Sequence, residues 1–414
     1  FLERGIDGKG MQVIRVVIDC LQQCNLRCTY CHPGKTWERD VLSVDKIREI
    51  FKVSEKMGVL EITLTGGEIT LHPEFLEILK ATQELKRTVS TLITNATVIT
   101  PKIVEMLKKS NINRICVSLD GAEAATHNSA RGETFDRVVN GLKQLQDTNI
   151  PISILTVAHQ KNWQKVLEIS SMLVKNNWAS QHHIIAPCYS GEAKNNYDDQ
   201  KLTLSDFLTL QTEIDSRFQE FLGKGLYITF NSFWPATGKR SKVDNTRKIT
   251  LTQLAEQQKD CYIIVRPNGD VRLTAASWGR ETVGNAIVGN LKDESFESLF
   301  NRSEDLYQTG HVRQLSRDKE ALYKFQIGKS TVEPKSFLDQ NGMPRRTRKI
   351  PIKRLIASNI LKIELKASAM EDISENIKDK PSKYRIVKNP SNAYILFDRE
   401  SAMVTLLKET EADR

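Results

Sequence analysis

The sequence contains no long apolar run and few cysteines, and each absence excludes a class of protein. No stretch approaches the roughly 18 consecutive apolar residues that a membrane-spanning helix needs, so we expect no membrane partner. No charged segment followed by an apolar one opens the chain, which argues against a secretory leader. Seven cysteines in 414 residues are too few for a secreted disulfide scaffold. We therefore expect a cytoplasmic protein whose cysteines serve a metal or cofactor site.

The chain does contain enough apolar material for large folded domains. Hydrophobic residues make up 39% of the sequence, and 60 basic against 51 acidic residues give a net charge of +9. This balance excludes a disordered or low-complexity protein. At about 150 residues per domain, a chain of 414 residues is expected to form two or three domains.

Between residues 11 and 187, short β-branched runs alternate with segments of helical periodicity. The expected strands are Val13–Asp19, Glu61–Thr65, Thr88–Thr94, Arg114–Leu119, Ile152–Val157 and His182–Ala186. The expected helices are Val44–Met57, Pro73–Thr82, Lys102–Lys109, Phe135–Gln146 and Trp163–Lys175. This alternation predicts an α/β fold with a parallel sheet, and six units predict a partial (β/α)6 barrel. Such a sheet gathers its chemistry at the carboxyl ends of its strands.

The pattern changes after Gly191. We predict a long helix over Leu202–Leu222 and a β-hairpin formed by Tyr262–Arg266 and Val271–Thr274. Three more strands are expected near the end, at Tyr384–Val387, Ala393–Phe397 and Met403–Leu407. The expected division is a barrel over 10–195, a helical linker over 196–260, a hairpin domain over 261–335, and a basic linker with a small domain over 336–414.

Three cysteines lie close together in the loop after the first predicted strand. The spacing of Cys24, Cys28 and Cys31 allows one loop to wrap a metal centre with soft thiolate ligands. An iron–sulfur cube usually takes four cysteine ligands, so three would leave one iron free to bind another molecule. The alternative is a zinc site that His32 completes. Cys20 lies at the end of the strand, and we expect it to be a small buried hydrophobe.

Glycines and polar residues follow three other predicted strands at the same edge. The segment Gly66–Glu68 ends the second strand, where paired glycines let the backbone approach a ligand and Glu68 provides an acceptor for an ammonium group. Asn95 follows the third strand, and Ser118 and Asp120 end the fourth. Each of these strand-end segments alone is compatible with a simple turn. Together they favour a bound cofactor over a zinc site, which needs none of them.

With these residues in place, the chain resembles the radical S-adenosylmethionine (SAM) enzymes over roughly residues 10–190. The resemblance is carried by the three-cysteine loop, by Tyr30 just before its last cysteine, and by the Gly-Gly-Glu segment. It implies that Cys24, Cys28 and Cys31 hold a 4Fe–4S cluster whose open iron is chelated by the methionine moiety of SAM. It also implies that the amino group of SAM contacts Gly66, Gly67 and Glu68, and that adenine contacts Tyr30 and Val157. The methionine carboxylate or the ribose would contact Asn95, Ser118 and Asp120. Arg131 would pair with the carboxylate.

The chemistry that this resemblance implies is reductive cleavage of SAM. One electron from an external donor of the flavodoxin or ferredoxin type would split SAM into methionine and a 5′-deoxyadenosyl radical. That radical would abstract a hydrogen atom from the substrate, so the protein must position the substrate and exclude water.

Two later segments resemble parts of the peptide-modifying branch of these enzymes. Cys261, the turn at Asn268–Val271 and the segment Gly289–Leu291 resemble the auxiliary-cluster domain called SPASM or twitch. No cysteine follows Cys261 in the sequence, so we predict a degenerate SPASM/twitch-like domain without a cluster, with Cys261 as a core thiol or a hydrogen donor. The last three strands resemble a winged-helix peptide-recognition domain, incomplete at Arg414, that would bind a leader peptide as an added strand. The alternative is a small sheet packed on the main body.

The leading functional prediction is a radical enzyme that modifies a peptide, specifically a ribosomally synthesised precursor. The candidate outcomes are epimerisation, crosslinking and backbone modification. Cys188, after the sixth strand, is the candidate hydrogen donor for epimerisation, with buried filler as its alternative role. A small-molecule substrate such as a sugar, nucleoside or cofactor intermediate is the alternative, and a non-enzymatic metal-binding interaction protein is a third. The basic run 345–354 is interpreted as a solvated linker, so we expect no nucleic acid partner.

Overall fold

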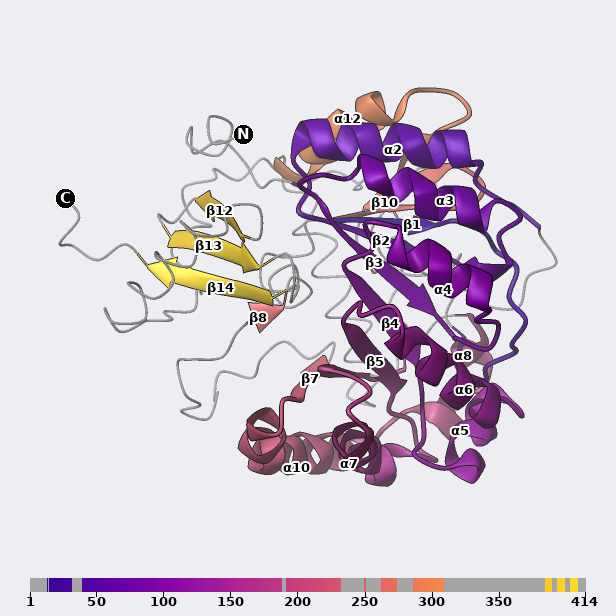
Figure 1. Ribbon diagram of the computed structural model, residues 1–414, viewed down its shortest axis with the longest axis vertical. Coiled ribbons are helices and arrows are strands. Elements are labelled where there is room, and N and C mark those ends of the chain that lie inside the picture. The colour runs from indigo at the N-terminus through magenta and orange to yellow at the C-terminus, as the bar shows by residue number, and fades with distance from the viewer. Residues whose placement is uncertain are drawn as a thin grey trace.

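A ten-stranded sheet organises the part of the chain that the structure describes. The computed structural model describes residues 13, 15–31, 39–187, 191–231, 249–250, 262–273, 286–308, 384–388, 393–398 and 403–408. The sheet has the strand order β11-β10-β9-β1-β2-β3-β4-β5-β6-β7 (Figure 1). Its parallel strands are β1 (Arg15–Asp19), β2 (Glu61–Thr65), β3 (Val89–Thr94), β4 (Arg114–Ser118), β5 (Ile152–Val157), β6 (Gln181–Ile185) and β7 (Tyr227–Asn231). The predicted α/β fold with a partial barrel is therefore confirmed, and β7 extends it by a strand that the sequence did not indicate.

Helices connect these strands, and several of them lie on the outer face of the curved sheet (Figure 1). They are α2 (Val44–Met57), α3 (Phe75–Ala81), α4 (Pro101–Lys108), α5 (Ala124–Arg131), α6 (Phe135–Gln146), α7 (Val166–Asn176), α8 (Gly191–Asn195), α9 (Tyr197–Gln200) and α10 (Leu204–Gly223), with 3-10 turns η1 (Ile69–Leu71), η2 (Thr82–Glu84) and η3 (Trp163–Lys165). The ends of α2 follow from its sequence. The Ser43 side chain accepts a hydrogen bond from the first turn, and Gly58 ends the helix at a φ of 77°.

The main core lies between the sheet and these helices. The apolar face of α2, with Ile47, Ile50 and Phe51, is fully buried against strand residues such as Ile18 and Ile62. Every residue of β2 is buried because this strand is covered on both faces. Burying each such side chain contributes roughly 1.5–3 kcal/mol, so this layer stabilises the packing of the helices on the sheet.

The predicted hairpin joins the barrel sheet next to β1. Strand β9 (Tyr262–Val265) pairs in parallel with β1, and β10 (Asp270–Leu273) and β11 (Ala286–Asn290) follow in antiparallel order. A buried ion pair between Arg266 and Asp19 connects the end of β9 to the end of β1. Helix α12 (Phe296–Gln308) then packs against α2, where its Phe296 N–H donates to Glu49 at 2.7 Å. Cys261 lies outside the described residues.

A second sheet contains the three strands predicted near the end of the chain. Its order is β12 (Tyr384–Lys388), β13 (Ala393–Asp398), β14 (Met403–Lys408) and β8 (Ile249–Thr250), and all its pairs are antiparallel (Figure 1). The two-residue strand β8 covers only Met403 and Val404 of β14. The predicted basic linker of residues 345–354 lies outside the described residues.

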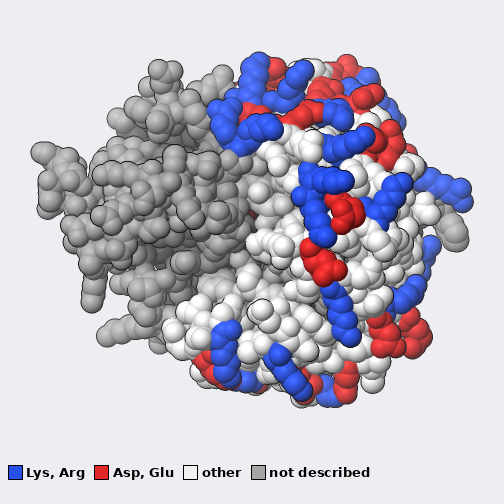
Figure 2. Space-filling model, viewed as in Figure 1, with Lys and Arg blue, Asp and Glu red and all other residues white. Residues whose placement is uncertain are grey.

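The helix-covered face of the molecule carries charges of both signs. Figure 2 shows Lys and Arg side chains interspersed with Asp and Glu side chains on this face. Several form ion pairs, including Arg48 with Glu84, Lys80 with Glu77, and Lys108 with Glu105. Within the described ranges, no helix combines the length and the apolar character needed to cross a membrane.

Candidate active site

The cysteine loop lies at the carboxyl edge of the parallel sheet and is hydrogen-bonded to the segment after β2. The N–H of Cys20 donates to the carbonyl of Thr65 at 2.8 Å. The N–H groups of Gly67 and Glu68 donate to the carbonyls of Leu21 and Gln23 at 2.8 and 2.9 Å. Backbone hydrogen bonds therefore hold the start of the cysteine loop against the end of β2.

The glycine pair makes this close approach possible. A Cβ atom on Gly66 would lie 2.6 Å from the Leu21 carbonyl oxygen, and one on Gly67 would lie 2.2 Å from the Gln23 carbonyl oxygen. Real Cβ atoms do not reach such distances, so any larger residue would push the cysteine loop away. The glycines thus position the loop itself. Their contact with the SAM amino group stays a prediction.

Replacing Gly67 with alanine is therefore expected to displace the cysteine loop. Overpacking of this kind costs about 1–3 kcal/mol of unfolding free energy, and the displaced loop should retain less iron after reconstitution. Gly223→Ala is the matched control, because a Cβ at the end of α10 meets no atom within 4 Å. Unfolding curves and iron assays on both variants provide the measurement, and equal iron content in the two would contradict the role given to Gly67.

The three predicted cluster ligands are partly exposed thiols. Cys24, Cys28 and Cys31 form no disulfide and are of intermediate exposure, whereas Cys20 is fully buried, as predicted. Burial raises the pKa of the Cys24 thiol to about 11 and also raises the pKa of Cys28. Metal ions bind thiolates, so binding must release these protons. Within the described ranges, no three His, Cys, Asp or Glu side chains are grouped as a single metal ion requires, and His32 lies outside those ranges.

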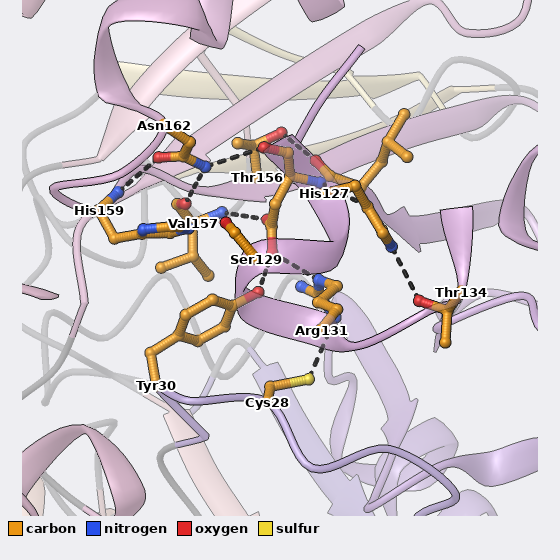
Figure 3. Close-up of polar contacts among 12 residues, drawn as sticks. Cys28, Tyr30, His127, Ser129, Arg131, Thr134, Thr156, Val157, His159 and Asn162 are labelled. Atoms are coloured by element: carbon orange, nitrogen blue, oxygen red, sulfur yellow. Dashed lines mark hydrogen bonds and ion pairs between the residues drawn. The ribbon is translucent and has the colours of Figure 1, made fainter. Parts of the chain in front are cut away.

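Asp120 is the centre of a buried network beside Cys28. One carboxylate oxygen accepts hydrogen bonds from the Tyr30 hydroxyl and, at 2.5 Å, from Arg131 Nε. The other accepts the backbone N–H of Val157 at 2.9 Å. Figure 3 shows Tyr30, Arg131 and Cys28 converging from the cysteine loop and α5. The network brings together Tyr30, Asp120, Arg131 and Val157, four residues singled out from the sequence.

The charges in this network are fixed by their mutual contacts. Burial alone would raise the pKa of Asp120, but the Arg131 guanidinium and the hydrogen bonds from Tyr30 and Arg131 outweigh it and lower that pKa. Burial together with the neighbouring carboxylate raises the pKa of Tyr30 well above its usual value. The network therefore holds a carboxylate, a neutral phenol and a guanidinium. Arg131 also lies with its Nη1 atom 3.9 Å from Cys28 Sγ, where its charge favours a thiolate.

A second network places Glu68 and Asn95 beside Cys24. Glu68 is buried, and its carboxylate accepts hydrogen bonds from the Thr94 hydroxyl and the Asn95 backbone N–H, both at 2.6 Å, as well as two from Thr70. Asn95 Nδ2 in turn donates to Asn25 Oδ1 at 2.9 Å and lies 4.0 Å from Cys24 Sγ. Glu68 therefore ties β2 to β3 and positions Asn95 near the cluster ligands. Ser118 is buried at the end of β4, two residues before Asp120.

Two residues of this site were not indicated by the sequence. Asn162 is buried after β5, and its Nδ2 atom donates to the carbonyls of Asp120 and Val157, each at 2.9 Å. His159 is fully buried, and its ring lies against Tyr30 with centroids 5.6 Å apart (Figure 3). The only signal available was their position just after a strand at the active edge. Cys188 lies outside the described residues, so its role as a hydrogen donor stays a prediction.

The donor set fits an iron–sulfur cluster on chemical grounds. Three soft sulfur ligands come from one short loop, which suits iron bound with sulfide. The buried guanidinium of Arg131 beside Cys28 offsets the negative charge that thiolate ligands bring. A separate small cluster of Tyr30, Ala130, Val157 and Ala193 forms an apolar wall next to Cys28. The polar networks of Asp120 and Glu68 beside this apolar wall are suited to a ligand with a charged end and a flat base.

Comparison with known proteins supports this interpretation. Residues 19–173 match the family model described as the radical SAM superfamily. The chain is 31% identical over 166 residues to the AdoMet-dependent heme synthase of Methanosarcina barkeri, covering 39% of this chain and 47% of that protein. It is 28% identical over 181 residues to a probable GTP 3′,8-cyclase of Saccharolobus islandicus, covering 43% and 58% of the two chains. The chain thus spans about half the length of the curated relatives it matches.

The similarity to solved structures covers more of the chain than the barrel alone. Streptococcus suis SuiB aligns with a TM-score of 0.59 at 18% identity, covering 80% of this chain and 77% of that chain. The protein anSMEcpe with bound AdoMet aligns with a TM-score of 0.53 at 18% identity, covering 76% and 87%. At this level of identity the alignments establish a shared fold. For residues 19–173, the match to the radical SAM family model agrees with the resemblance stated from the sequence.

Proposed function

We propose that this chain is a radical SAM enzyme that abstracts a hydrogen atom from a peptide, namely a ribosomally synthesised precursor. The observation that carries the proposal is the partly exposed trio Cys24, Cys28 and Cys31 beside the buried Tyr30–Asp120–Arg131 network. When bound, the cluster and SAM supply the radical chemistry. The protein's own residues bind, orient and shield the reactants.

Each network supports a distinct part of SAM binding. A SAM carboxylate would be repelled by Asp120 and attracted by Arg131, so Asp120 acts by fixing the guanidinium rather than by touching that group. Tyr30 and Val157 lie together in the apolar wall and suit the adenine ring. Asn95 lies beside Cys24, where its amide suits the polar part of SAM close to the cluster. Glu68 holds Asn95 in place through the backbone.

A peptide substrate is supported by the structural relatives and by the second sheet. The relatives include SuiB bound to its precursor peptide SuiA, which aligns with a TM-score of 0.57 at 19% identity, covering 70% of this chain and 64% of that chain. Strand β12 stands at one end of the second sheet, next to β13. The outer edge of such a strand offers backbone groups to which a leader peptide can add as a further strand.

The test is reductive cleavage of SAM with and without a peptide. Anaerobically reconstituted protein, given SAM and dithionite, is expected to release 5′-deoxyadenosine. A precursor peptide encoded beside the enzyme should increase that release and change in mass, or take up deuterium from D2O if it is epimerised. The same peptide without its leader is the control and should react more slowly. Absence of 5′-deoxyadenosine from iron-loaded protein would contradict the proposal.

A small-molecule substrate is the second candidate, and it is suggested by the names of the curated relatives. The matching part of the chain is similar to a probable GTP 3′,8-cyclase and to a heme synthase. These similarities cover the SAM-binding half that the two classes share. Turnover of a nucleotide such as GTP, with no response to any precursor peptide, would favour this candidate. In both cases we propose an external electron donor of the flavodoxin or ferredoxin type.

A further inference from the structure

His159 carries a buried ring nitrogen for which the described residues provide no partner. The residue follows β5 and is 0% exposed, and its Nε2 atom lacks a hydrogen bond within the described part of the chain. Buried polar groups in native proteins nearly always have a hydrogen-bond partner, because a buried donor or acceptor without one costs free energy. A ligand that brings an acceptor to this nitrogen would remove the cost.

The hydrogen-bonding pattern around the ring determines what Nε2 can offer. The backbone N–H of Lys161 donates to Nδ1 at 3.3 Å, so Nδ1 is an acceptor. Burial lowers the pKa of His159 to about 4, so the ring is neutral near pH 7. A neutral imidazole whose Nδ1 accepts carries its hydrogen on Nε2. His159 therefore presents one N–H donor.

The position of that donor is fixed by its own turn. The backbone N–H of His159 donates to Asn162 Oδ1 at 2.7 Å, and Asn162 is anchored to the carbonyls of Asp120 and Val157. On its other side the His159 ring lies against Tyr30, tilted by 35° (Figure 3). Hydrogen bonds and a ring contact thus join the donor to the Tyr30–Asp120–Arg131 network.

We propose that His159 Nε2–H donates a hydrogen bond to a ring nitrogen of the adenine of SAM and so selects the base of the cofactor. This inference rests on the proposed function. Adenine offers ring-nitrogen acceptors and a flat face that suits the neighbouring Tyr30 and Val157. The side chains that shield Nε2 must be displaced when the base enters.

Two substitutions separate the donor from the rest of the side chain. His159→Asn keeps an acceptor near the Nδ1 position for Lys161 but removes the distal N–H, whereas His159→Gln returns an N–H near the Nε2 position. By anaerobic calorimetry on iron-loaded protein, His159→Asn should bind SAM about tenfold more weakly, the effect of one hydrogen bond. His159→Gln should recover most of this loss. Methionine, which has no base, should bind all three proteins equally.

Analogues of SAM provide a second measurement that needs no variant. Of the 1-deaza, 3-deaza and 7-deaza forms, one should bind the wild-type protein about tenfold more weakly than SAM, and His159→Asn should remove that difference. Equal binding of SAM by wild type and His159→Asn, or equal binding of all three analogues by wild type, would overturn the role of His159 and leave the proposed function intact. Wild-type protein that holds iron but binds neither SAM nor methionine would instead overturn the proposed function.

Discussion

Replacing Cys28 with serine is expected to abolish the iron–sulfur cluster. Anaerobically reconstituted wild-type protein should bind about four irons per chain, because a 4Fe–4S cube contains four irons and Cys24, Cys28 and Cys31 would be its protein ligands. A serine hydroxyl is a hard and poor ligand for iron bound with sulfide, so one substitution should remove the cluster rather than one iron. Iron and sulfide assays, together with visible absorption, measure the effect. Cleavage of SAM should be lost with the cluster.

The matched control is Cys116→Ala. Cys116 is also a free thiol, but it belongs to β4 and lies outside the cysteine loop. This variant should keep the full iron content. Retention of the cluster in Cys28→Ser would mean that the trio does not hold it. Stoichiometric zinc without sulfide in the wild-type protein would support the zinc site of the alternative interpretation instead.

Replacing Asp120 with asparagine is expected to be the most destabilising single change in the site. It leaves the Arg131 guanidinium buried without its counter-charge, and breaking a buried pair in this way costs about 3–5 kcal/mol. The Tyr30 hydroxyl and the Val157 N–H also lose a charged acceptor. Denaturant unfolding measures the stability, and calorimetry should show weaker SAM binding because Arg131 is no longer fixed.

Two comparisons show whether this loss comes from the buried charge. Glu123→Gln breaks an exposed ion pair with Lys165, which solvent screens, and should change stability little. The double variant Asp120→Asn with Arg131→Gln removes both charges, so its loss should be smaller than the sum of the two single losses. Additive losses would show that Asp120 and Arg131 do not stabilise each other.

The barrel was predictable because its strands and helices are fixed by local patterns. The structure reproduces the predicted bounds of Glu61–Thr65, Ile152–Val157, Val44–Met57 and Phe135–Gln146. The two strands are rich in β-branched residues and the two helices have a regular apolar face, while Ser43 and Gly58 mark the ends of α2. Strand β7 was missed because it stands alone after a long helix, with no following unit to suggest alternation.

The sequence predicted the three candidate cluster ligands but not the contacts that position the residues around them. The spacing of Cys24, Cys28 and Cys31 is a local property of one loop. Helix α5, which carries Arg131, was missed because its sequence Ala124–Arg131 is polar and short. The use of the glycine pair was also hidden, because the atoms that approach Gly66 and Gly67 belong to a loop about 45 residues earlier in the chain. Such contacts depend on the tertiary fold.

The parallel pairing of β9 with β1 has a consequence for how the protein is made. The cysteine loop begins directly after β1, yet β1 gains its second neighbouring strand, and Asp19 its partner Arg266, only after residues 262–266 have been synthesised. Until then one backbone edge of β1 and a carboxylate meant for burial stay exposed. A nascent chain without β9 therefore lacks the pairing of β1 with β9 and the Asp19–Arg266 ion pair, both of which lie next to the start of the cysteine loop. Iron binding during translation should therefore follow the synthesis of β9.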